Sequence, residues 1–235
     1  MEEKLSEKEI FEYAKELMRC AENDFISAKT IYNSENKIYS TILYHIQQSV
    51  EKLAKAELVL RKQLDIRELK KVNHRTPNAF MISLDKAKQD NVISPFIKQY
   101  IDEDALKKAQ GYVLNPEEIM QSKKEVLLQM LNYYEVFKQS GVADAIQLHA
   151  LFSPIADRVK EDQEEKREAY MNLFFMSWIT FFHAEMTRYP DGKIKPWQYD
   201  ENNAFVQIIP DFFNKIERTL KIMQGYKLKS EEGLQ

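Results

Sequence analysis

The chain has 235 residues and a formal net charge of −3, with 34 Lys and Arg against 37 Asp and Glu. A chain of this length suits one domain, or one domain with a large insertion, and can bury enough surface to fold without a disulfide or a metal. Cys20 is the only cysteine, which excludes an intrachain disulfide and a cysteine zinc site, and the acidic balance argues against a general nucleic-acid coat protein.

The N-terminal residues 1–10 are charged and lack the apolar core of a signal peptide. No apolar run approaches the roughly 18 residues of a membrane span, and residues 173–184 are expected to form a buried helix instead. We therefore expect a cytoplasmic protein without a membrane segment. The four histidines show no helical metal-ligand spacing and no glycine-rich phosphate loop is present, so we expect no metal site and no cofactor.

Signals for helix starts are frequent along the chain. Four dipeptides pair an N-cap residue with proline at the first helical position, namely Thr76-Pro77, Ser94-Pro95, Asn115-Pro116 and Ser153-Pro154. Ser6 and Glu9 have the spacing of a capping box. Together with apolar residues that recur every three or four positions, these signals predict helices at 6–33, 37–63, 77–90, 95–110, 116–140, 143–151, 154–187 and 201–224.

No alternating strand pattern and no hairpin turn signal appears, so the predicted fold class is all-α. The short connection at 34–37 predicts that the first two helices run antiparallel, in an up-and-down bundle completed by the helices at 154–187 and 201–224. Pro210 is expected to kink the last helix. We expect one domain over 1–235, with extra helices inserted at about 90–165.

The stretch YHIQQSVEKLAKAEL, residues 44–58, combines an apolar face with an ordered set of polar residues. Glu51 and Lys55 stand four residues apart, as do Gln48 and Lys52, in the orientation that stabilises a helix. Each such pair is worth only about 0.2–0.5 kcal/mol, which is too little to explain the order of the residues.

This stretch resembles a motif of the HEPN family (higher eukaryotes and prokaryotes nucleotide-binding domain). The residues that carry the resemblance are Tyr44, His45, Gln47, Gln48, Ser49, Val50, Glu51, Lys52, Lys55 and Ala56. Three further pieces follow the family order, at 21–32, 73–84 and 187–192, so the resemblance covers about 10–90 and 170–225. It implies a helical bundle, a homodimer, and a nucleotide, RNA or nucleotidyltransferase partner.

Some members of the family are metal-independent RNases that use an arginine followed by a histidine. In these members four to six residues separate the two, and Arg67 and His74 match this spacing with six residues between them. The guanidinium is expected to hold phosphate and the imidazole to move a proton. Glu68, directly after the arginine, departs from the family pattern and would repel phosphate. The alternative role of His74 is to support the helix that follows it.

Two segments are rich in cations, one of them with aromatic residues between the cations. Such segments favour binding of a nucleotide or single-stranded RNA. Residues 61–75 hold six Lys and Arg, and residues 188–199 interleave cations with Tyr189, Trp197 and Tyr199. The alternative is a solvated loop whose aromatic rings fold back onto the bundle. The predicted ligand-binding residues are Lys70, Lys71, Arg75, Arg188, Tyr189, Lys193 and Trp197. His183, among phenylalanines, is expected to be a core histidine bonded to backbone.

Three hypotheses remain open from the sequence. The first is a non-catalytic HEPN-like binding module, and the second is a HEPN-type RNase of the toxin or defence class. The third is a helical interaction scaffold whose inserted helices make the contacts.

Overall fold

The computed structural model describes residues 6–72, 76–89, 121–133, 135, 164–181, 183, 187 and 195–226. Within these residues the chain forms eight α-helices and one 3-10 helix and no strand, which confirms the all-α prediction. The elements are α1 (Glu7–Tyr32), α2 (Tyr39–Leu60), α3 (Ile66–Val72), α4 (Thr76–Gln89), α8 (Lys124–Leu131), α11 (Glu164–Thr180), η1 (Pro196–Gln198), α13 (Ala204–Gln207) and α14 (Ile209–Gln224).

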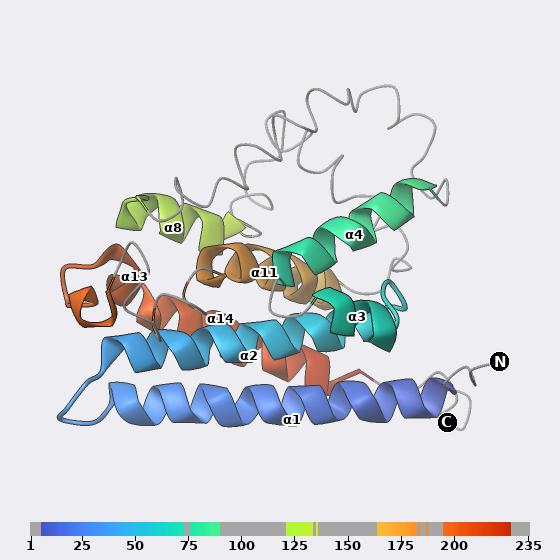
Figure 1. Cartoon of the computed structure of the whole chain (residues 1–235), viewed down its shortest axis with the longest axis horizontal. Coiled ribbons are helices and arrows are strands. Elements are labelled where there is room, and N and C mark those ends of the chain that lie inside the picture. The colour runs from blue at the N-terminus through green and yellow to red at the C-terminus, as the bar shows by residue number, and fades with distance from the viewer. Residues whose placement is uncertain are drawn as a thin grey trace.

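The two longest helices, α1 and α2, form the predicted antiparallel hairpin (Figure 1). The Ser6 hydroxyl accepts from the Glu9 backbone amide while the Glu9 carboxylate accepts from the Ser6 amide, so the predicted capping box starts α1. Phe25 and Tyr32 on α1 make edge contacts with Phe213 on α14, at 5.8 and 5.3 Å between ring centroids. The hairpin is thereby closed by α14, as the apolar periodicity predicts.

Helix α11 lies at the centre of the bundle, between α2 on one side and α4 and α8 on the other (Figure 1). Every residue from 169 to 180 is buried, as expected of a helix that is apolar nearly all round. Phe174 contacts Phe80 of α4 at 5.6 Å between ring centroids. This helix therefore fixes the position of α4 relative to α2.

The structure differs from the predicted elements in two places. Residues 66–72 form α3, whereas the sequence predicts no helix between 63 and 77. The last predicted helix is two helices, because α13 ends at Gln207 and α14 begins at Ile209 with Pro210 in its first turn. Proline lacks an amide hydrogen and suits a helix start, so Pro210 separates two helices rather than kinking one.

Several predictions lie outside the described residues. These are the helices at 95–110 and 143–151, most of the helix at 116–140, and the first part of the helix at 154–187. None of the described helices is long and apolar enough to cross a membrane.

Candidate functional site

The polar residues of the quoted motif meet α1 at Asp24. His45 Nδ1 and Asp24 Oδ1 are joined by a hydrogen bond of 3.0 Å, and Lys52 Nζ donates to the other carboxylate oxygen at 2.5 Å. Lys52 Nζ also donates to Gln48 Oε1 at 3.3 Å. Because the Asp24 carboxylate accepts from both the Lys52 ammonium and the His45 imidazole, it links α1 to two residues of α2.

The same set of bonds continues towards the interior. Gln48 Nε2 donates to Gln47 Oε1 at 2.7 Å, and Gln47 Nε2 donates to Glu51 Oε2 at 3.0 Å. Lys55 Nζ then donates to Glu51 Oε1 at 2.7 Å. Gln47 and Glu51 are 2 % and 5 % exposed, so these bonds are what make their burial tolerable. The order of residues in the motif is thus explained by one continuous hydrogen-bonded series from Asp24 to Lys55.

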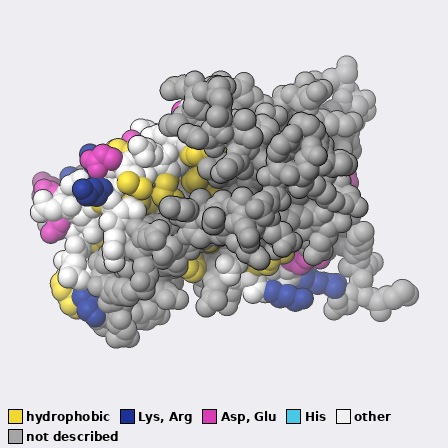
Figure 2. All heavy atoms as spheres, turned by 90° about the horizontal axis from the view of Figure 1, so that it is seen from above, with side chains coloured by type: hydrophobic (Ala, Val, Ile, Leu, Met, Phe, Trp, Pro, Cys, Tyr) yellow, Lys and Arg dark blue, Asp and Glu magenta, His cyan; other side chains and the backbone are white. Residues whose placement is uncertain are grey.

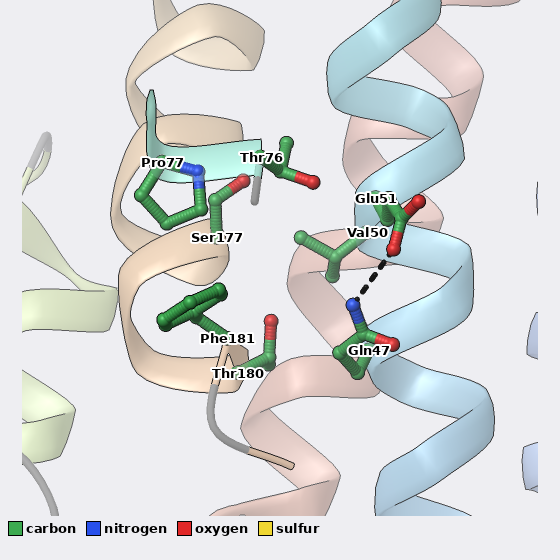
Figure 3. Close-up of a pocket in the computed structure, with 8 residues that line it drawn as sticks. All are labelled: Gln47, Val50, Glu51, Thr76, Pro77, Ser177, Thr180 and Phe181. Carbon is green, nitrogen blue, oxygen red and sulfur yellow. Dashed lines mark hydrogen bonds between the residues drawn. The ribbon is translucent and has the colours of Figure 1, made fainter. Parts of the chain in front are cut away.

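Gln47 and Glu51 face a narrow crevice where three helices converge (Figure 3). Its other walls are the start of α4, with Thr76 and Pro77, and the end of α11 with the residue after it, lined by Ser177, Thr180 and Phe181. The side chains fill it so completely that it does not admit a water molecule. The Thr76 and Ser177 hydroxyls are buried without a hydrogen-bond partner among the described residues. The crevice is therefore a polar packing seam between α2, α4 and α11 rather than a ligand pocket.

The predicted cations of α3 lie at the surface. Arg67, Lys70 and Lys71 are exposed, and the two lysines occupy the last turn of the helix. Glu68 accepts from the Asp65 amide at 2.9 Å, and Asp65 accepts from the Glu68 amide at 2.8 Å. This reciprocal cap holds the Glu68 carboxylate at the N-terminal end of α3. The lysines therefore project from the end of the helix opposite to the acidic cap.

Two cations of the segment 61–75 form ion pairs with other helix residues, one of them buried and the other exposed. Arg61, whose side chain is 8 % exposed, donates through Nε to Glu57, a fully buried carboxylate. Its Nη2 donates to the backbone oxygen of Lys166 on α11, and Tyr226 donates to Glu57 at 3.2 Å. Lys62 pairs with Glu7 at the start of α1.

Burial alone would lower the pKa of the Arg61 guanidinium, but the Glu57 carboxylate beside it raises the pKa above its ordinary value. Glu57 and Tyr226 were missed from the sequence. The signal for Glu57 is that it is the one acidic residue in the mostly apolar stretch LAKAELVL, residues 53–60, and stands four residues before Arg61.

The second basic segment is only partly described, at residues 195–199. Trp197 in η1 is 72 % exposed, whereas Tyr199 is 5 % exposed and lies in the core. One aromatic ring therefore faces solvent and the other folds back. His74, Arg75, Arg188, Tyr189 and Lys193 lie outside the described residues.

The structure does not bring Trp197 together with the lysines of α3. Tyr39, at the start of α2, donates to Glu201, shortly after η1, at 3.2 Å, whereas α3 follows the other end of α2. A helix of 22 residues is about 33 Å long. Figure 1 shows α3 and α13 at opposite ends of α2. Seen from above, the α13 end shows basic, acidic and hydrophobic side chains mixed (Figure 2).

The two described histidines are both held by the fold. His45 is bonded to Asp24, and His183 is fully buried with Nδ1 joined to the Tyr199 hydroxyl at 2.8 Å. Burial lowers the pKa of His183 to about 3. The core position predicted for His183 is confirmed, although its ring partner is Tyr199 and not backbone. Among the described residues, no three His, Cys, Asp or Glu side chains are placed to hold a metal ion.

The two long helices α1 and α2 form a hairpin that polar residues of one motif hold together, and the short basic helix α3 follows it. This arrangement defines an α-helical bundle. Residues 14–75 match the family model described as HEPN domain, which spans most of α1, all of α2 and α3. The chain therefore carries HEPN-domain sequence over these residues, which confirms the resemblance for that part. Comparisons with curated proteins and with solved structures gave no match.

Proposed function

We propose that the chain is a HEPN-type binding module that holds the phosphates of a nucleotide or a single-stranded RNA at the exposed cations of α3. The observation that carries this proposal is the exposure of Arg67, Lys70 and Lys71 on one short helix, whose Glu68 carboxylate is engaged in the N-terminal cap. Binding of phosphate needs a density of positive charge and little precise geometry. Two neighbouring lysines and an arginine supply that density.

The absence of nuclease turnover is part of the same proposal. In the RNase mechanism that the resemblance implies, an accessible imidazole moves the proton of the ribose hydroxyl. His45 is engaged with Asp24, and His183 is buried as the neutral ring, so neither of the two described histidines serves. The alternative, a metal-independent RNase, requires Arg67 and His74 to act together. The exposure of Arg67 favours that alternative as the second candidate.

One experiment separates the two functions. Purified protein is incubated with a labelled single-stranded RNA in the presence of a metal chelator, and both cleavage and fluorescence anisotropy are followed. The proposal predicts binding without cleavage, and the same result for Arg67→Ala and His74→Ala except for weaker binding by the first. Cleavage by the wild type that both substitutions abolish would establish the RNase instead.

Assembly as a homodimer, or with a nucleotidyltransferase partner, is proposed on the family resemblance. Support from the surface comes from three large apolar side chains that face solvent, Ile26, Ile38 and Trp197, at 54 %, 56 % and 72 % exposure. Exposed apolar residues of this size are typical of contact surfaces when they gather in a patch. Light scattering tests the dimer directly, since a mass of one 27.8 kDa chain at tens of micromolar protein would exclude it.

A further inference from the structure

A groove of about 240 Å³ lies between the first half of α1, the last residue of α2 and the end of α14, and neither the motif residues Gln47 to Lys55 nor the cations of α3 line it. Its floor is apolar, formed by Phe11, Met18 and Met223, which are 6 %, 8 % and 1 % exposed. Pockets for drug-sized ligands have volumes of about 300–1,000 Å³, so this groove suits a smaller molecule.

The shape of the groove limits its ligand further. Its lining along α1 runs from Phe11 to Glu22, which is about 16 Å along a helix axis. A volume of about 240 Å³ along that length suits a slender ligand such as a single carbon chain. Met18 and Met223 are unbranched and flexible, so the walls can adapt to such a chain.

The rim of the groove supplies positive charge on the α1 side. Lys15 and Arg19 both line it, and the Lys15 ammonium lies 4.4 Å from the centre of the Phe11 ring in the floor. Their ion-pair partners are Glu12 and Glu16, three residues earlier on the same helix, in pairs whose side chains are 45–66 % exposed. Exposed pairs of this kind are weak, so both cations can turn to an anion in the groove.

From these features we infer that the groove between α1 and α14 binds a small amphipathic anion, a medium-chain carboxylic acid. Its acyl chain lies along Met18 and Met223, and its carboxylate pairs with Lys15 and Arg19. Arginine presents a planar pair of donors that matches a carboxylate. Glu22, at the far end of the lining, repels a second negative charge, so a monoanion is preferred over a polyphosphate. This site is independent of the phosphate surface proposed on α3.

The inference is tested by titrating the full chain with decanoate in a calorimeter, below the concentration at which decanoate forms micelles. We expect saturable binding with one decanoate per chain. Lys15→Ala/Arg19→Ala should weaken it by about tenfold or more, because both partners of the carboxylate are lost. Decanol, which keeps the chain and lacks the charge, should bind the wild type more weakly than decanoate.

Two further variants separate the groove from general effects. Gln224→Trp places a large ring at an exposed position of the groove lining and should abolish binding without disturbing the core. Lys123→Ala/Lys124→Ala removes two neighbouring lysines at the start of α8, outside the groove, and should bind as the wild type does.

The same series tests whether the groove takes a free fatty acid or a membrane lipid, and whether it is independent of the RNA surface on α3. Phosphatidylcholine vesicles should not co-sediment the protein, and single-stranded RNA should not displace decanoate. No saturable binding of decanoate, equal binding by wild type and Gln224→Trp, or a preference for vesicles would each overturn the inference. RNA binding at α3 is measured separately, so its failure leaves this result unaffected.

Discussion

The C-terminal end of α2 and the helix α3 that follows it both carry several cations, but these cations have different roles. Arg61 lies in the interior against Glu57, Tyr226 and the backbone of α11. Lys70 and Lys71, nine and ten residues further along the chain, face solvent on α3. A count of cations in a segment therefore overstates the charge that a ligand can reach, because part of that charge holds the helices together.

The largest expected effect is the loss of stability when the buried cation Arg61 is removed. Arg61→Ala leaves the buried Glu57 carboxylate without its cation, and removal of one partner of a buried pair costs about 3–5 kcal/mol. The free energy of unfolding, from urea titrations followed by circular dichroism, should fall by that amount. Lys62→Ala, which removes a cation from the exposed pair with Glu7, is the matched control and should cost about 1 kcal/mol or less. Equal losses in the two variants would show that Arg61 is not buried as described.

A second buried group, His183, makes the free energy of unfolding depend on pH. The pKa of His183 is lowered to about 3 by burial, whereas in the unfolded chain it is near 6.5. Below pH 6.5 the unfolded state therefore binds a proton that the folded state refuses, and stability falls by up to about 1.4 kcal/mol per pH unit as the pH decreases towards 3. Above pH 6.5 His183 contributes no pH dependence.

The measurement is the free energy of unfolding at pH 7 and at pH 4.5 for wild type and His183→Gln. The loss on acidification should be smaller in the variant by about 2–3 kcal/mol. Carboxylates elsewhere titrate alike in both proteins and cancel in this difference. An identical acid loss in the two proteins would mean that His183 is protonated in the folded state.

The motif on α2 is expected to have an intermediate effect. Glu51→Ala removes the acceptor of both Gln47 and Lys55, and the loss should be about 1–3 kcal/mol. A double-mutant cycle with Gln47→Ala should show a coupling of about 0.5–1.5 kcal/mol, because the two side chains share a buried hydrogen bond. Strictly additive effects would indicate that the series from Asp24 to Lys55 is not formed.

Much of the fold could be predicted from local signals. The Ser6 capping box, the short turn before α2 and the apolar period of α1 are all encoded within a few residues, and the structure confirms them. Pro210 was recognised as an interruption, although whether proline kinks a helix or starts a new one depends on the residues around Ile208. Helix α3 is only seven residues long, so its periodicity is too short to detect.

The site was less predictable, because burial of a charge depends on distant parts of the chain. The sequence alone gives Arg61 as one more surface cation, because the residues that bury it, on α11 and at Tyr226, are far away along the chain. The partner of Lys52 on α1, Asp24, is 28 residues away in sequence. The bonds that Gln48 and Glu51 make four residues along α2 were predicted, because they follow from helical spacing alone.

The smallest expected effect on stability belongs to the outward lysines, where the proposed function has its most direct test. Lys70→Ala/Lys71→Ala should change the free energy of unfolding by no more than about 0.5 kcal/mol, as expected of surface substitutions. Lys123→Ala/Lys124→Ala on α8 serves as the matched control.

The decisive measurement is the affinity of these three proteins for a labelled single-stranded RNA at several salt concentrations between about 50 and 200 mM. Each phosphate contact contributes about 0.7 to the slope of log K against log salt for a single strand, so loss of two lysines should reduce that slope by about 1.4. The account predicts this reduction in Lys70→Ala/Lys71→Ala and an unchanged slope in the control. Equal slopes in all three proteins, or no salt-dependent binding by the wild type, would contradict it.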